Sequence, residues 1–153
     1  MKRSPVTTRT AVALVALVLC AGLLAAQTPP DKFLGHKVGE DRKLADYTQI
    51  KAYFEKLDQE SNRLALFTIG ESVLKKPIVM AAISTPGNLA RLDRWKEIAR
   101  KLRDPRVTPA DEARRLAKEG KAIVLITCSL HATEIAASQM SMELAYDLVT
   151  GRT

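Results

Sequence analysis

The feature that most constrains the fold of this chain is an uninterrupted apolar run near its carboxyl end, Ala122–Cys128, which reads AIVLITC. The run carries no charge, and polar and apolar side chains do not alternate along it. A strand exposed on one face alternates, whereas a continuous apolar strand is typical of a sheet that is covered on both faces. We therefore expect residues 122–128 to form a buried central strand.

A long apolar helix is predicted directly after this strand. Residues 129–133 suit a turn, and from Glu134 onward apolar side chains recur on one helix face, at Ala136, Met140, Leu144 and Leu148. Ile135, Met142 and Tyr146 make the rest of the surface apolar, so we expect the helix to be buried nearly all round until Gly151 ends it.

A helix and a hairpin are predicted earlier in the chain. Apolar residues with helical spacing follow Asp46, at Ile50, Tyr53, Phe54 and Leu57. Asp46 can cap this helix by accepting a free backbone N–H, and the helix should run to about Glu60. Residues 64–70 and 78–84 then suit two strands, and the short polar link between them favours a hairpin.

Two basic helices are predicted between the hairpin and the central strand. The first has an apolar face and should end at Asp104-Pro105, because a residue before proline leaves the helical region. The second should have Thr108 as its cap, Pro109 as its first residue and a left-handed Gly120 at its end. We expect this pair to lie over the surface of the domain.

The first 26 residues have the layout of a secretory signal. Lys2, Arg3 and Arg9 precede an uncharged run, Ala11–Ala26, which ends in small residues. We expect cleavage after Ala26 and a secreted or periplasmic protein. The alternative is an uncleaved membrane anchor, although the run is short for a full span. Residues 27–45 are then a polar, extended N-terminal arm that orders only by packing on the domain, and its His36 is expected to be a surface or packing histidine rather than a ligand.

Charge and cysteine content exclude several classes of protein. Three of the 24 basic residues lie in the leader and all 17 acidic residues follow it, which leaves a net charge of +4 on the rest of the chain. No concentrated basic stripe is visible, so we expect no nucleic-acid partner, and a membrane contact only through the leader. Cys128 is the one cysteine after the leader, which suits a buried free thiol.

His131 and Glu134 are the candidate metal ligands. Both follow the predicted buried strand, and open α/β sheets bind their ligands at the carboxyl ends of strands. Imidazole nitrogen and carboxylate oxygen are suitable zinc ligands, and zinc with three protein ligands activates a water molecule. The spacing is also common by chance, and a glutamate in the first turn of a helix is favoured by the helix dipole alone.

Two blocks of sequence resemble the zinc metallocarboxypeptidase family. Ser129–Glu134 (SLHATE), between the predicted strand and helix, resembles the first zinc motif of that family. Thr68–Ser72 (TIGES), followed by Lys75–Ile78 (KKPI), is similar to its N-terminal hairpin, although Lys75-Lys76 stand where the family usually has Gly-Arg. The resemblance covers about residues 44–151.

The resemblance implies an α/β fold of three layers, α/β/α, with a mixed sheet, of which residues 46–153 would be an incomplete N-terminal part that ends after the first zinc-motif helix. It implies that His131 and Glu134 bind Zn²⁺. It also implies a later histidine ligand, arginines that hold the substrate carboxylate and a glutamate general base, none of which can be assigned within this chain. The substrate would be a peptide or protein, hydrolysed near its C-terminus by metal-activated water.

Two other functions remain open at this point. One is a related zinc amidohydrolase of the desuccinylase and aspartoacylase type, which uses a similar H-x-x-E motif on N-acylated amino acids. The other is a binding domain that keeps the fold without the chemistry. The leader and the upstream helix and hairpin favour a peptidase, which would be inactive as this chain alone.

Overall fold

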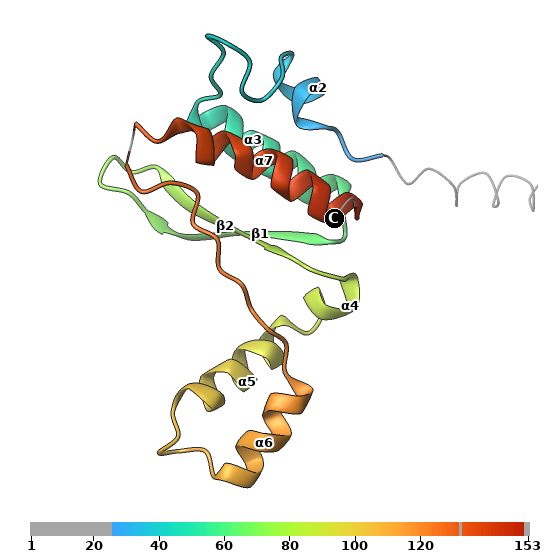
Figure 1. The fold of residues 1–153 in the computed structure, drawn as a ribbon, viewed down its shortest axis with the longest axis vertical. Coiled ribbons are helices and arrows are strands. Elements are labelled where there is room, and N and C mark those ends of the chain that lie inside the picture. Colours follow the sequence, from blue (N-terminus) through green and yellow to red (C-terminus); the bar gives the residue numbers. More distant parts are fainter. Residues whose placement is uncertain (1–25, 132, 152–153) are drawn as a thin grey trace, which may run out of the picture.

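The computed structural model describes residues 26–131 and 133–151 (Figure 1). The predicted leader, apart from Ala26, lies outside these residues. In chain order the elements are α2 (Pro30–Leu34), α3 (Tyr47–Glu60), β1 (Leu64–Glu71), β2 (Pro77–Ile83), α4 (Pro86–Leu89), α5 (Leu92–Arg103), α6 (Ala110–Glu119) and α7 (Ile135–Thr150).

Helix α3 begins where its capping signal predicts. The Asp46 carboxylate accepts a hydrogen bond from the Gln49 backbone N–H at 2.9 Å, and the Gln49 side chain accepts one from the Asp46 N–H at 3.0 Å. This reciprocal pair satisfies two donors near the start of the helix and fixes its first turn. The helix ends at Glu60, as predicted.

The predicted hairpin is confirmed. Strands β1 and β2 pair antiparallel, from Leu64 opposite Ile83 to Glu71 opposite Pro77, with an irregularity between Thr68 and Gly70. Leu64 is buried, and the side chains of Leu66, Ala81 and Ile83 pack beside it against the neighbouring helices. The hairpin therefore has one face in the core.

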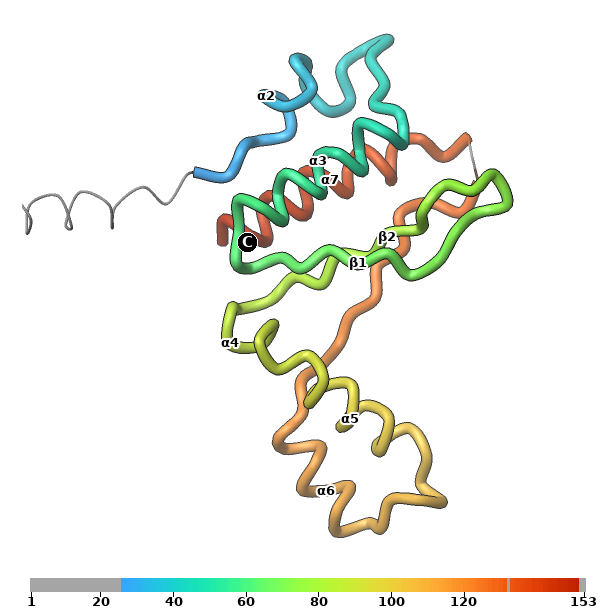
Figure 2. The backbone as a smooth tube through the Cα atoms, turned by 180° about the vertical axis from the view of Figure 1, so that it is seen from behind, coloured from blue at the N-terminus to red at the C-terminus, as the bar shows by residue number. Residues whose placement is uncertain are grey.

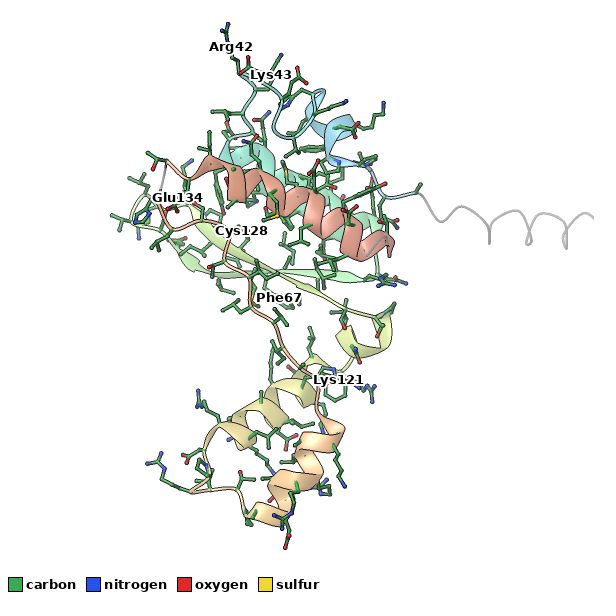
Figure 3. The ribbon with its side chains drawn as sticks, in the orientation of Figure 1. Arg42, Lys43, Phe67, Lys121, Cys128 and Glu134 are labelled. Atoms are coloured by element: carbon green, nitrogen blue, oxygen red, sulfur yellow. The ribbon has the colours of Figure 1, made fainter. Side chains whose placement is uncertain are left out.

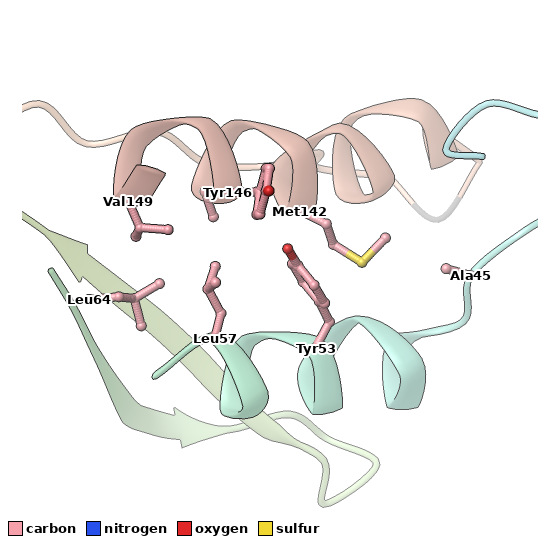
Figure 4. Close-up of a cluster of buried hydrophobic side chains, with 8 residues drawn as sticks. Ala45, Tyr53, Leu57, Leu64, Met142, Tyr146 and Val149 are labelled. Carbon is pink, nitrogen blue, oxygen red and sulfur yellow. The ribbon is translucent and has the colours of Figure 1, made fainter. Parts of the chain in front are cut away.

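The main core lies between this face and two helices, α3 and α7, which run side by side in both views (Figures 1 and 2). Figure 4 shows Tyr53 and Leu57 of α3 directed toward Met142, Tyr146 and Val149 of α7, with Leu64 beside Leu57. The buried members of the cluster are Ala45, Tyr53, Leu57, Leu64, Met142, Ala145, Tyr146 and Val149. The packing joins two helices that are far apart in the sequence.

Helix α7 ends at Gly151 in the left-handed conformation, with φ of 73°, as predicted. The expectation that it is buried nearly all round is wrong. Its buried apolar face is formed by Met142, Ala145, Tyr146 and Val149, whereas Ile135 and Met140 are 46% and 42% exposed. The helix packs on α3 and the hairpin along one side only, because the described residues place no second layer over its other side.

The predicted central strand is not formed. Residues 121–129 have no regular secondary structure, and Ile123, Val124, Leu125 and Ile126 are 54–80% exposed. A strand forms by backbone hydrogen bonds to a neighbour, and within the described residues the only sheet is the β1–β2 pair. The predicted α/β class holds. The sheet of the described residues is a two-stranded antiparallel sheet rather than a mixed one, and helices α3 and α7 lie on one of its faces.

Helices α5 and α6 form a separate hairpin with its own small core of Trp95, Ile98 and Leu116. Two predicted details are wrong. Helix α6 begins at Ala110, and the Thr108 hydroxyl donates to the Lys101 carbonyl at 2.8 Å instead of capping the helix. Thr108 therefore links the turn to α5 by a hydrogen bond and does not cap α6.

Gly120 ends α6 with extended backbone, φ of −60° and ψ of 174°, rather than in the predicted left-handed conformation. A Cβ atom at this position would lie 3.1 Å from both the Ile98 side chain and the Leu116 carbonyl oxygen. Glycine is therefore favoured at this position by close packing and not by backbone conformation.

The N-terminal arm is more ordered than an extended lead-in. It contains α2, and its Phe33, Leu34 and Val38 pack on the main core. The buried Gln139 side chain of α7 accepts a hydrogen bond from the Ala45 N–H at 3.0 Å. Every helix within residues 26–131 and 133–151 falls short of the length and apolar character that a membrane span requires.

Glu60 links the start of the N-terminal arm to the end of α3 by hydrogen bonds. Its carboxylate accepts hydrogen bonds from the Thr28 N–H at 2.7 Å and the Thr28 hydroxyl at 2.8 Å, and it pairs with Lys56 at 2.7 Å. Partial burial raises the pKa of Glu60, but the hydrogen bonds from Lys56 and Thr28 outweigh it and place the pKa below the ordinary 4.5.

We expect acid to release the arm. A carboxyl group whose pKa is lowered by folding contributes stability above its unfolded pKa, and that contribution is lost as pH falls through the lower folded value. The Thr28 amide chemical shift should therefore change below pH 4.5. In Glu60→Gln this transition should be absent, whereas the control Glu55→Gln on the same helix should keep it. A flat Thr28 shift in the unmodified chain would contradict the assignment.

Candidate metal centre

The two predicted metal ligands lie in the turn that joins residues 122–128 to helix α7, at the left of Figure 3, where Glu134 is labelled. His131 Nδ1 lies 2.8 Å from Glu134 Oε1. Both side chains are accessible, with 67% and 49% of their surfaces exposed. The turn therefore brings an imidazole nitrogen and a carboxylate oxygen to one solvent-accessible point.

Glu134 also holds the backbone of the turn. Its second oxygen, Oε2, accepts hydrogen bonds from the N–H groups of Leu130 and His131, both at 3.0 Å. These contacts lower the pKa of Glu134 to about 2, with the largest part from the His131 backbone N–H, then the His131 side chain, then the Leu130 N–H. Glu134 is therefore an anion at neutral pH, as a metal ligand must be.

The contact between His131 and Glu134 has a consequence for metal binding. An ionised carboxylate only accepts hydrogen bonds, so His131 Nδ1 must carry a proton to approach Oε1 at 2.8 Å. A metal ion needs the lone pair of that nitrogen and takes the place of the proton. Binding of a metal at Nδ1 therefore converts a neutral imidazole to the tautomer that carries its proton on Nε2, and releases a proton to solvent only from a doubly protonated ring.

The conformation of the turn is unusual at Ser129. This residue has a φ of 80°, in the left-handed region that side chains other than glycine seldom adopt. Its hydroxyl donates to the His131 carbonyl at 3.1 Å, and the Glu134 N–H donates to the same oxygen at 3.1 Å. Two hydrogen bonds therefore converge on the His131 carbonyl oxygen. They offset part of the free-energy cost of the left-handed backbone at Ser129.

The side chain of Glu134 does not cap helix α7 by a hydrogen bond. Glu134 stands at the cap position of α7, but its side chain makes no hydrogen bond to the free N–H groups of the helix. The carboxylate points back to the turn instead. The sequence analysis did not predict this contact. A short turn does allow a carboxylate to accept hydrogen bonds from the backbone N–H groups three and four residues before it.

The described residues contain no group of three or more His, Cys, Asp or Glu side chains that could hold a metal ion. His36 lies in the arm, with Nδ1 3.0 Å from the Lys37 carbonyl oxygen. Cys128 is a free thiol, half-buried rather than buried as predicted. His131 and Glu134 thus have the donor chemistry that zinc prefers, and they form a two-ligand pair.

Sequence comparison indicates the family of this chain. The sequence model of the zinc carboxypeptidase family matches residues 50–153. The match extends from α3 through the hairpin and the turn to α7, and it begins after the N-terminal arm. No curated protein and no solved structure matches the chain.

The hydrogen bonds that Glu134 accepts can be tested without a metal ion. We expect Glu134→Ala to speed amide hydrogen exchange at Leu130 and His131 by about tenfold, since charge-assisted hydrogen bonds are lost. Glu134→Gln keeps an oxygen acceptor and should have a smaller effect. Glu143→Ala removes an exposed glutamate of α7 and serves as the control. Equal exchange in the Glu134→Ala and Glu143→Ala proteins would show that the carboxylate does not hold the turn.

Proposed function

Because this chain belongs to the zinc carboxypeptidase family, we propose that it supplies the first two zinc ligands, His131 and Glu134, of a metallopeptidase that hydrolyses peptide bonds. The observation that carries the proposal is the approach of His131 Nδ1 to Glu134 Oε1 at 2.8 Å on an accessible surface. A nitrogen and an anionic oxygen that already meet at one point lose little further conformational freedom when they bind a metal ion.

Each residue of the turn has a distinct part in this proposal. Glu134 uses one oxygen, Oε1, toward the metal position and the other to hold the Leu130 and His131 amides. His131 contributes the lone pair of Nδ1 once its proton has left. Zinc, when bound, supplies an activated water nucleophile and stabilises the developing oxyanion charge.

Other parts of the active site are proposed to lie in a longer protein of which this chain is the N-terminal portion. The third ligand, the general base and the arginines that bind the substrate carboxylate are not assigned to any described residue. The exposed apolar segment 122–127 agrees with this proposal, because such a segment is normally covered. The basic and apolar leader supports export of that protein, as a secreted or periplasmic enzyme.

Zinc binding by the chain itself tests the ligand assignment. We expect His131→Ala and Glu134→Ala each to lower zinc affinity by about tenfold or more, because each removes one of two ligands. His36→Ala removes the other histidine and should leave the affinity unchanged. Isothermal titration calorimetry measures the zinc affinity of each protein. An equal loss in the His36→Ala and His131→Ala proteins would refute the assignment.

Hydrolysis assays test the class of reaction. We expect the protein encoded by the complete reading frame to release C-terminal residues from peptides in a zinc-dependent way, and His131→Ala to abolish this release. Hydrolysis of N-acylated amino acids but not of peptides would identify an amidohydrolase instead. Zinc binding without either activity would identify a binding domain. The 153-residue chain should not turn over peptides, since only two ligands are proposed within it.

A further inference from the structure

The candidate metal ligands stand at a poorly packed end of helix α7. Residues 133–136 are all exposed, and Ile135, the first residue of the helix, has 46% of its surface accessible. Residues 137–138 are half-buried. The first buried side chain after the ligands is that of Gln139, which is only 4% exposed. Between the ligands and this point, the helix gains little support from the main core.

Gln139 begins the buried face of α7. Met142 and Tyr146 follow it at helical spacing and are buried on the same face. One turn earlier this face would continue at Ile135, which is exposed. Gln139 is thus the buried residue of α7 nearest to the ligands, and about 7.5 Å of helix axis separates it from Glu134.

The Gln139 side chain makes a hydrogen bond across the core. Its Oε1 accepts from the Ala45 backbone N–H at 3.0 Å. Ala45 is 9% exposed and lies just before α3, so its N–H takes no part in the hydrogen bonds of that helix. A buried backbone N–H without an acceptor destabilises a fold, and so does a buried amide oxygen without a donor. Each of these two groups therefore satisfies the other.

The partner of Gln139 belongs to the N-terminal arm and is itself held in place. The Ala45 side chain is part of the main core, and the Asp46–Gln49 capping pair fixes the residues that follow it. Figure 4 shows Ala45 at the end of the cluster where α3 and α7 both begin. Ala45 also lies before residue 50, where the match to the zinc carboxypeptidase family starts. The likeness to the family therefore does not account for this contact.

The start of α7 lacks the cap that stabilises the start of α3. Glu134 stands at the cap position, but its side chain makes no hydrogen bond to the free N–H groups of the helix. The first turn of an uncapped helix unwinds readily, because these N–H groups have no partner within the helix. A buried contact one turn into the helix limits such unwinding to residues 135–138.

We propose that Gln139 is a positioning residue for the candidate metal ligands, an inference that rests on the proposed function. Its hydrogen bond to Ala45 holds the start of α7 on the main core and keeps the first turn wound. Glu134 adjoins that turn, and its carboxylate reaches the Leu130 and His131 amides only while its own backbone keeps its place. The turn of residues 129–134 sets the geometry of the pair, and Gln139 fixes the helix that carries it.

Amide hydrogen exchange of the 153-residue chain without metal tests this role. Gln139→Leu keeps a buried side chain of similar size and removes the acceptor of the Ala45 N–H. We expect exchange at Leu130 and His131 to become about fivefold faster in this variant, the effect of losing one buried hydrogen bond. Gln139→Glu keeps an oxygen that can accept from Ala45, so it should have a smaller effect.

Val149→Ala is the matched control. Val149 is 3% exposed at the other end of α7, so the cavity that this substitution leaves lowers the free energy of unfolding without touching Ala45. Exchange at Leu130 and His131 should stay unchanged in this control. A merely structural role of Gln139 would make the Gln139→Leu and Val149→Ala proteins alike.

Zinc affinity, measured by calorimetry, links the contact to the ligands. We expect Gln139→Leu to weaken zinc binding by at most the factor seen in exchange, because zinc binds only the molecules in which the turn is formed. Val149→Ala should leave the affinity unchanged.

Three outcomes would overturn the positioning role. One is equal exchange at Leu130 and His131 in the Gln139→Leu and Val149→Ala proteins. Another is a Gln139→Glu protein that exchanges as fast as Gln139→Leu, since the acceptor oxygen would then not be the cause. The last is an unchanged zinc affinity in Gln139→Leu. Failure of the ligand assignment looks different, because His131→Ala would then keep its zinc affinity while exchange at Leu130 still responded to Gln139→Leu.

Discussion

The packing of α3 against α7 over the β1–β2 hairpin is the interaction on which the rest of this structure depends. Tyr53 and Leu57 from α3 meet Met142 and Val149 from α7, and all four are at most 3% exposed. Burial of such side chains is worth roughly 1.5–3 kcal/mol each in transfer free energy. Helix α7 begins immediately after the turn of residues 129–134 that carries the candidate metal ligands. The packing of α3 against α7 therefore also fixes the position of Glu134 relative to the β1–β2 hairpin.

Features whose causes are local could be predicted from the sequence. The Asp46–Gln49 capping pair needs only residues three apart, and the glycine at 151 needs only its own backbone freedom. The β1–β2 pairing is set by a short link and two apolar runs. The spacing of His131 and Glu134 belongs to the same class, since one tight turn brings both side chains together.

Features that depend on distant neighbours could not be predicted in the same way. An apolar run such as 122–128 indicates what the segment would bury, but a strand exists only where another strand pairs with it, and the described residues provide none. The buried face of α7 was also misjudged, because composition alone does not say which side meets α3. The direction of the Glu134 carboxylate, toward two backbone amides, likewise depends on the path of the turn.

The exposed apolar segment 122–127 thus leads to the candidate metal ligands, and its two ends are held differently. Lys121 lies over Trp95 at one end, and the turn of Ser129, His131 and Glu134 closes the other. Because no ladder of backbone hydrogen bonds holds the segment between them, the ligand geometry must come from the turn itself. The carboxylate of Glu134 does this by binding the Leu130 and His131 amides through one oxygen and facing the imidazole with the other. The pair is therefore organised by hydrogen bonds within five consecutive residues, although no strand among the described residues pairs with the segment that leads to it.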